Sequence, residues 1–266
     1  SSGLAAWRPL YKKILQTQKQ QGRVNFLASP VAKTFVYGEL HREIPEYACG
    51  TKSLYSDLGF ILLGEAVEEV SRLSLDRFCA ERVFKPLQLR HTAFVDLSLL
   101  RRRGLEPVSE MIAPTERCPW RKKVLCGEVH DDNAWAMGGV AGHAGLFSSA
   151  KDIDTLMTRL EDCWAGRSDM IPQKIVREFL RRDESIPAST RALGWDTPSA
   201  TGSSAGSTFP PTAIGHLGFT GTSIWYDPER DLLVVLLTNR VHPDRNNEAI
   251  REFRPFIHDL VAKAVE

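Results

Sequence analysis

The sequence predicts an α+β fold, in which an antiparallel sheet is flanked by helices and joined to a helical lobe. One observation is the apolar run Leu232–Leu237, which is rich in Val and Leu and suits a strand covered on both faces. It follows a turn at Asp227–Arg230, with aspartate and proline in the first two positions. The preceding segment, Gly215–Tyr226, is therefore expected to pair antiparallel with this run as a hairpin. The second observation is a series of amphipathic helical patterns on both sides of the hairpin.

Six helices are predicted from apolar residues that recur three and four positions apart. The predicted ranges are 9–22, 58–70, 74–85, 153–164, 172–180 and a C-terminal helix from 246 that is interrupted at Pro255. Ser74 is a suitable N-cap for the third helix, and Pro9 and Pro172 open two of the others. Residues 96–126 and 199–211 are expected to be irregular, the second because Ser, Thr, Gly and Pro dominate it.

Neither an internal repeat nor a long linker divides the chain, so a single domain over residues 1–266 is expected. Within it, residues 1–212 are predicted to form mainly a helical lobe and loops. Residues 213–266 are predicted to form the sheet hairpin and the C-terminal helix.

Charge and composition exclude several function classes. With 34 basic and 33 acidic residues the net charge is +1, so no overall field favours nucleic acid or an anionic membrane. The longest apolar runs are far shorter than the ~20 residues that a membrane-spanning helix needs, so a soluble chain is expected. The five cysteines lack the close paired spacing of a zinc site and are expected to be free or buried thiols. The compartment and the oligomeric state are not indicated.

Two serine motifs resemble nucleophile elements, and neither fits its chemistry. In the first, Ser148 precedes Lys151 by three residues, but Lys151 falls on the face of its helix opposite the apolar residues and should be solvated. Ser149 and Asp152 in the same segment resemble a helix-capping box. The second motif, Gly202–Gly206, matches GxSxG but lies in a Ser/Thr/Pro loop, without the strand and helix that this motif requires. We therefore expect no nucleophile at either position.

The glycine-rich segment before the apolar strand is unusual for a strand. Gly215, Gly218 and Gly221 remove side chains at intervals of three, and His216 and Thr220 supply polar groups between them. Glycine in a strand often marks the close approach of a ligand or of another backbone. A bulged edge strand without a ligand explains the same pattern, so the pattern alone leaves both interpretations open.

Three segments, taken in order, resemble a known family. They are Tyr55-Ser56-Asp57, the loop GHAGLFSSAKDI around His143, and His216-Leu217-Gly218. The chain resembles the class C serine beta-lactamases and the related DD-peptidases and esterases of the penicillin-recognising fold. Tyr55-Ser56-Asp57 matches the family's Tyr-x-Asn element, and His216-Leu217-Gly218 matches its Lys-Thr-Gly strand. The resemblance covers nearly the whole chain.

The resemblance implies a beta-lactamase/transpeptidase-like fold and a serine hydrolase that acts on an ester or amide. The substrate would be a beta-lactam, a D-Ala peptide or a carboxylic ester, cleaved through an acyl-enzyme without a cofactor or a metal. Tyr55, Asp57 and His216 would be catalytic, with Tyr55 sharing proton transfer. Gly218, Phe219, Thr220 and His143 would bind the substrate. The Phe219 N–H would be one of the two oxyanion donors. The implied partner is a small-molecule or peptidoglycan-like substrate.

This sequence departs from the family pattern in three places. No residue matches the family's Ser-x-x-Lys element, which we expect to lie upstream of Ser1 together with the first strands. The chain by itself is therefore expected to be inactive. Asp57 replaces the family's Asn and His216 replaces its Lys, so the site should be less suited to the carboxylate of a beta-lactam.

Two other function classes remain open at this point. One is a non-catalytic binding or regulatory module with the same fold. The other is a metallohydrolase that uses His130, Asp131 and His143, with Asp132 and His216 as further candidates. No HxH or HxxxH spacing supports this metal site, and His-Asp-Asp in a loop also suits a turn with side-chain caps.

Overall fold

The protein is described by a computed structural model over residues 2–22 and 26–265. The chain forms two compact units, Ser1–Ser148 and Ser149–Glu266, and each is described here by itself. The predicted α+β fold is confirmed, because helices and small antiparallel sheets occur together. The predicted single domain with a division at residues 212 and 213 stays a prediction. Within the described ranges, no helix is long and apolar enough to cross a membrane.

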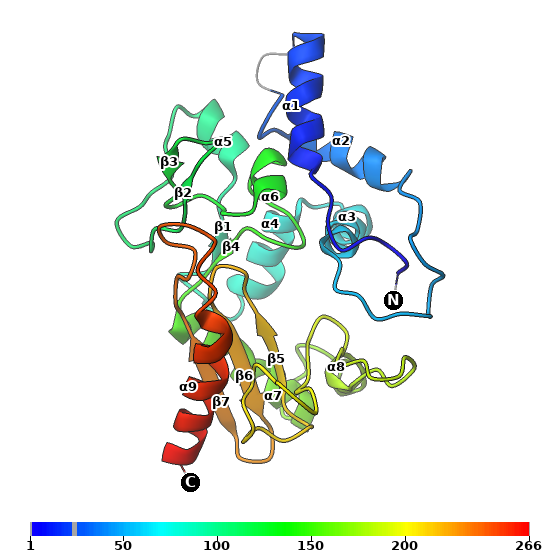
Figure 1. Cartoon of the computed structure of the whole chain (residues 1–266), viewed down its shortest axis with the longest axis vertical. Coiled ribbons are helices and arrows are strands. Elements are labelled where there is room, and N and C mark those ends of the chain that lie inside the picture. The colour runs from blue at the N-terminus through cyan, green and yellow to red at the C-terminus, as the bar shows by residue number, and fades with distance from the viewer. Residues whose placement is uncertain (1, 23–25, 266) are drawn as a thin grey trace. The chain divides into compact units, whose positions relative to one another are not determined.

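The first unit is mainly helical (Figure 1). Its helices are α1 Leu10–Gln21, α2 Pro30–Leu40, α3 Asp57–Ser71, α4 Leu75–Cys79 with a π-helical continuation over Ala80–Phe84, α5 Leu97–Arg102 and α6 Asp132–Ala136. The predicted helices at 9–22, 58–70 and 74–85 correspond to α1, α3 and the α4 segment. Helix α2 was not predicted, although Ser29 caps it and Pro30 opens it.

Residues 96–126 are more regular than the sequence predicts. They contain α5 and a short hairpin of β2 (Arg117–Cys118) and β3 (Lys123–Val124). A second small antiparallel pair joins β1 (Ala93–Phe94) to β4 (Leu146–Phe147). These two-residue strands are too short to give a periodic signal in the sequence.

The core of the first unit holds α3 in place. Its largest fully buried apolar side chains are Leu10, Ile14, Val36, Leu58, Ile61 and Met137, and they come from α1, α2, α3 and the segment after α6. Because two of these residues lie in the first turns of α3, the beginning of that helix is fixed by apolar packing.

The second unit is built on the three-stranded sheet β5 (Ile214–Leu217), β6 (Ser223–Asp227) and β7 (Leu232–Leu236). Helix α7 spans Ala150–Ala165, α8 spans Gln173–Leu180, and α9 (Ile250–Ala264) runs alongside β7 (Figure 1). The buried Trp225 of β6 packs against Phe209, and together they centre the apolar core between the sheet and α9.

The predicted two-stranded hairpin is corrected to a three-stranded meander. Strand β6 pairs with β7 from Ser223 to Asp227, as the turn at Asp227–Arg230 predicts. The earlier residues do not extend this pairing, because the chain reverses over residues 218–222 and β5 pairs with β6 instead. Gly221 has a φ of +122°, which a residue with a side chain rarely adopts, and it allows this reversal.

Helix α9 is continuous through Pro255, whereas the sequence predicts an interruption there. Proline removes one backbone hydrogen bond and favours a kink. Buried side chains lie on both sides of it, Ile250 and Arg254 before and His258 and Ala262 after, so both halves are packed in the same unit. This packing offsets the lost hydrogen bond.

Candidate active site

Tyr55 lies immediately before α3 in the first unit and is 36% exposed. Its ring is 5.6 Å from that of Phe60, centroid to centroid. The next residue, Ser56, caps α3 by accepting a hydrogen bond from the Gly59 N–H at 3.2 Å. The same hydroxyl donates to the Ala5 carbonyl at 2.6 Å. Tyr55 is thus an accessible side chain on a backbone that is fixed at the following residue.

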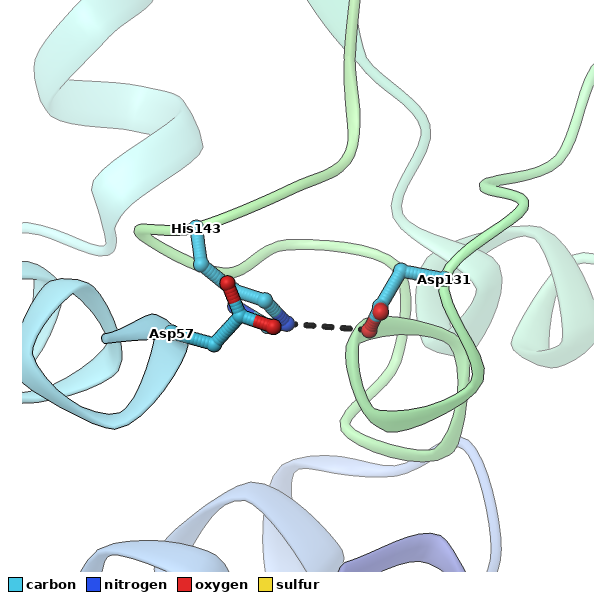
Figure 2. Close-up of side chains that lie close together, drawn as sticks. All are labelled: Asp57, Asp131 and His143. Carbon is cyan, nitrogen blue, oxygen red and sulfur yellow. Dashed lines mark hydrogen bonds and ion pairs between the residues drawn. The ribbon is translucent and has the colours of Figure 1, made fainter. Parts of the chain in front are cut away.

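Asp57 is the first residue of α3 and is partly buried. Burial raises the pKa of its carboxyl, the nearby His143 opposes that rise, and the negative charge of Asp131 adds to it. Its carboxylate accepts no hydrogen bond from any residue that the structure describes. Figure 2 shows Asp57, His143 and Asp131 gathered at one place.

His143 and Asp131 form a hydrogen-bonded pair. A ring nitrogen of His143, Nε2, lies 2.9 Å from Asp131 Oδ1, and the side chain of His143 is only 1% exposed. Asp131 Oδ1 also accepts the Ala134 N–H at 2.7 Å and so caps α6. Burial acts to raise the pKa of Asp131, but the hydrogen bond and charge of His143 and the Ala134 N–H outweigh it, so the pKa is lowered. This carboxylate is therefore held ionised.

The metal set considered from the sequence needs a correction. The structure does not place His130 with Asp131 and His143, because His130 Nε2 lies 3.0 Å from Glu116 Oε2. Asp132 forms an ion pair with Arg121 at 2.9 Å. Asp57 takes their place beside Asp131 and His143. Sequence reasoning missed this grouping because Asp57 is far from the other two along the chain.

His216 lies on β5 in the second unit and is partly buried. Its Nδ1 is 3.0 Å from the carbonyl oxygen of Leu217, which can only accept, so Nδ1 carries the proton. Burial lowers the pKa of His216, more than the hydrogen bond to Leu217 raises it, and Arg191 lowers it further. A neutral imidazole is thus favoured at this position.

Gly218, Phe219 and Thr220 form the turn that follows β5. A side chain at Gly218 would collide with the hydroxyl of Thr222, so the close approach here is to the protein's own chain. Phe219 is 60% exposed. The Arg240 guanidinium lies 4.3 Å from its ring centroid and donates through Nε to the Phe219 carbonyl at 2.8 Å. Arg240, which belongs to the same second unit, therefore supports this turn.

The two serine motifs that the sequence analysis set aside have the predicted surroundings. Lys151 is exposed, and Ser149 caps α7 by accepting the Asp152 N–H at 3.2 Å. The hydroxyl of Ser148 lies 2.8 Å from that of Thr92. Residues 202–206 contain neither helix nor strand.

The comparisons with known proteins agree with this picture. A family model described as "Beta-lactamase" matches residues 1–255. The chain belongs to the beta-lactamase family. A putative D-alanyl-D-alanine carboxypeptidase from Salmonella agona is 36% identical over 77% of this chain and 49% of its own length. The chain thus spans about half the length of the curated relatives it matches.

Solved structures of this family share the fold. A beta-lactamase from Mycobacterium bovis matches 96% of this chain and 84% of its own, with a TM-score of 0.57 and 18% identity. A beta-lactamase/D-alanine carboxypeptidase from Yersinia pestis matches 88% of this chain and 61% of its own, with a TM-score of 0.57 and 16% identity. The predicted beta-lactamase-like fold is confirmed. The roles of Tyr55, Asp57, His216 and the other site residues stay predictions.

Proposed function

We propose that this chain is the downstream part of a serine hydrolase that cleaves an ester or amide through an acyl-enzyme. Peptides that end in D-alanine are the substrate we favour, since the Salmonella relative is named as a carboxypeptidase for such peptides. The observation that carries the proposal is the accessible phenol of Tyr55, fixed before α3 by the two hydrogen bonds of Ser56. An accessible hydroxyl in a fixed position is suited to exchange protons with a substrate.

In the proposed reaction, a serine and a lysine upstream of residue 1 supply the nucleophile and a base. The serine oxygen attacks the carbonyl carbon, and its proton passes to the pair formed by that lysine and Tyr55. The Phe219 N–H donates to the developing oxyanion. When the carbonyl re-forms, the leaving amine takes the proton, and the acyl group stays on the serine until water releases it as an acid.

His216 would bind the substrate's carboxylate through Nε2–H, which is present only in the protonated ring because Nδ1–H already donates to the Leu217 carbonyl. Burial favours the uncharged ring, so the ion pair that a lysine forms with a carboxylate is weakened here. His216→Ala should therefore raise KM for carboxylated substrates more than it lowers kcat.

The test measures acylation by a fluorescent penicillin and release of D-alanine from an acyl-D-Ala-D-Ala peptide, in the longer protein. Tyr55→Phe should lower turnover by about 10²–10⁴-fold with a small change in melting temperature. Tyr37→Phe is the matched control, since the Tyr37 hydroxyl bonds Glu68 at 3.0 Å and its loss should affect stability alone. Near wild-type turnover for Tyr55→Phe would refute the role of Tyr55.

The chain 1–266 alone is expected to show no acylation, because the Ser-x-x-Lys element is expected upstream of residue 1 and Lys151 is exposed. Stoichiometric acylation of Ser148 or Ser204, located by mass spectrometry, would overturn this view. If the longer protein binds D-Ala peptides but never forms an acyl-enzyme, the non-catalytic module becomes the better description.

A further inference from the structure

We propose that Asp57, Asp131 and His143 bind a first-row divalent cation, with Zn²⁺ preferred over Mg²⁺. One ligand atom from each residue lies within 4.8 Å of the other two. Figure 2 shows the two carboxylates and the imidazole directed toward one another from the start of α3, the start of α6 and the loop before β4. Two carboxylates and an imidazole form a ligand set that zinc accepts.

The carboxylate oxygens of this cluster are available to coordinate a cation. Both oxygens of Asp57 and the Oδ2 atom of Asp131 accept no hydrogen bond from the described part of the chain. The side chain of His143 is 1% exposed, and its Nδ1 atom is buried without a hydrogen-bond partner among the same residues. A buried polar atom such as this nitrogen is normally paired, whereas the side chain of Asp131 is partly exposed. A bound cation would be coordinated by these carboxylate oxygens together with one ring nitrogen of His143.

The negative charge at this place is only partly compensated by histidine. Among residues 2–22 and 26–265, neither Asp57 nor Asp131 forms an ion pair with a lysine or an arginine, and His143 is the basic residue hydrogen-bonded to Asp131. Two carboxylates so close together repel each other when both are ionised. A divalent cation would turn this repulsion into attraction.

Other acidic residues in the same unit show what a satisfied carboxylate looks like here. Glu116 is bonded to His130, Asp132 pairs with Arg121, and Glu128 pairs with Lys123 at 2.7 Å. Glu128 also accepts the Trp135 indole N–H at 2.6 Å. Unlike these three carboxylates, Asp57 accepts no hydrogen bond from the described residues.

The distances require little movement for binding. Zinc bonds of 2.0–2.2 Å at tetrahedral angles place neighbouring ligand atoms ~3.4 Å apart. His143 Nε2 and Asp131 Oδ1 are 2.9 Å apart, and no pair of ligand atoms exceeds 4.8 Å. Side-chain shifts of about an ångström would close the site around the ion. Mg²⁺ demands six oxygen-type ligands and should bind less tightly to a set that includes imidazole.

The inference does not depend on the proposed reaction, because a cation can bind whether or not the protein is a hydrolase. Its place is nonetheless specific. Asp57 is two residues from Tyr55, and only the helix-capping Ser56 separates them. A bound ion would therefore order the same backbone that holds the Tyr55 phenol.

The experiment titrates the metal-stripped protein with Zn²⁺ by calorimetry, and records melting temperatures with Zn²⁺ and with Mg²⁺. One Zn²⁺ per chain should bind and raise the melting temperature, with a smaller rise for Mg²⁺. Asp57→Asn keeps the shape of the side chain and should weaken Zn²⁺ binding by more than 10-fold, as should His143→Asn. His41→Gln is the matched control, because His41 pairs with Glu65 at 2.8 Å on the surface without a second carboxylate.

Co²⁺ provides a second readout that does not depend on folding stability. The visible spectrum of the Co²⁺ protein should show d–d bands of a four- or five-coordinate ion, without the intense thiolate band that binding at the exposed Cys49 would add. Absence of saturable Zn²⁺ binding would overturn the proposal. Stoichiometric binding that Asp57→Asn and His143→Asn leave unchanged would overturn it as well, provided both variants melt cooperatively.

Discussion

Arg254 of α9 is bonded directly to the Gly218 carbonyl, with 2.7 Å between Nη2 and the oxygen. The same nitrogen donates to the Thr222 carbonyl at 2.8 Å. One buried guanidinium therefore holds both ends of the turn that carries Phe219 and Thr220. Through this turn, α9 fixes the N–H that we propose as an oxyanion donor.

Arg254→Met should destabilise the second unit and loosen this turn. A hydrogen bond to a charged group contributes about 1.5–3 kcal/mol, so a loss of a few kcal/mol in the free energy of unfolding is expected. In the active longer protein kcat should fall more than KM changes. The control is Arg251→Met on the same helix, whose side chain is exposed and pairs with Glu248. If kcat of Arg254→Met equals kcat of the Arg251→Met control, Arg254 does not support the oxyanion site.

Lys151→Ala should leave the activity of the longer protein within a few-fold of wild type. Lys151 is exposed at the start of α7, and solvated side chains away from special contacts contribute little. Steady-state kinetics on a D-Ala peptide provide the measurement. A thousandfold loss with an unchanged melting temperature would identify Ser148 and Lys151 as the catalytic pair.

Ile61→Ala should lower the free energy of unfolding by about 2–5 kcal/mol, because Ile61 is fully buried in the core beneath α3. Leu63→Ala removes a similar side chain from the same helix, but Leu63 is 60% exposed, so a change within about 0.5 kcal/mol is expected. Urea denaturation of both variants measures the difference. Equal effects would contradict the orientation of α3.

The free energy of unfolding should fall as the pH drops through about 6.5, partly because of His258. This fully buried ring lies 2.8 Å from the Ser204 carbonyl and 3.1 Å from the Ser223 hydroxyl. Burial lowers its pKa and Arg254 lowers it further, while the Ser204 carbonyl and Asp259 act in the opposite direction. Below its ordinary pKa of 6.5 the unfolded state takes up a proton that the folded state does not, so stability is lost on acidification.

The check is the free energy of unfolding between pH 7.5 and 5.5, a range of about one unit on either side of that ordinary pKa. His258→Gln should flatten the slope, which one titrating group limits to ~1.4 kcal/mol per pH unit. An unchanged slope in the His258 variant would show that another group carries the pH dependence.

The sequence by itself determined the local elements and the family. Ser56, Ser149 and the turn at Asp227–Arg230 act on residues a few positions away, so α3, α7 and the pairing of β6 with β7 could be predicted from spacing alone. The exposed position of Lys151 followed in the same way, since helical period fixes the face of a residue. The order of three short motifs sufficed for the family.

Tertiary structure decided what depends on residues that are distant in the chain. The turn between β5 and β6 is held by Arg254, which lies on α9, and the continuity of α9 through Pro255 rests on packing along its buried face. Asp57 reaches Asp131 and His143 only because the core beneath α3 fixes where that helix begins. Periodicity and capping carry no information on such contacts, because the free energy that selects them comes from burial and pairing across the folded unit.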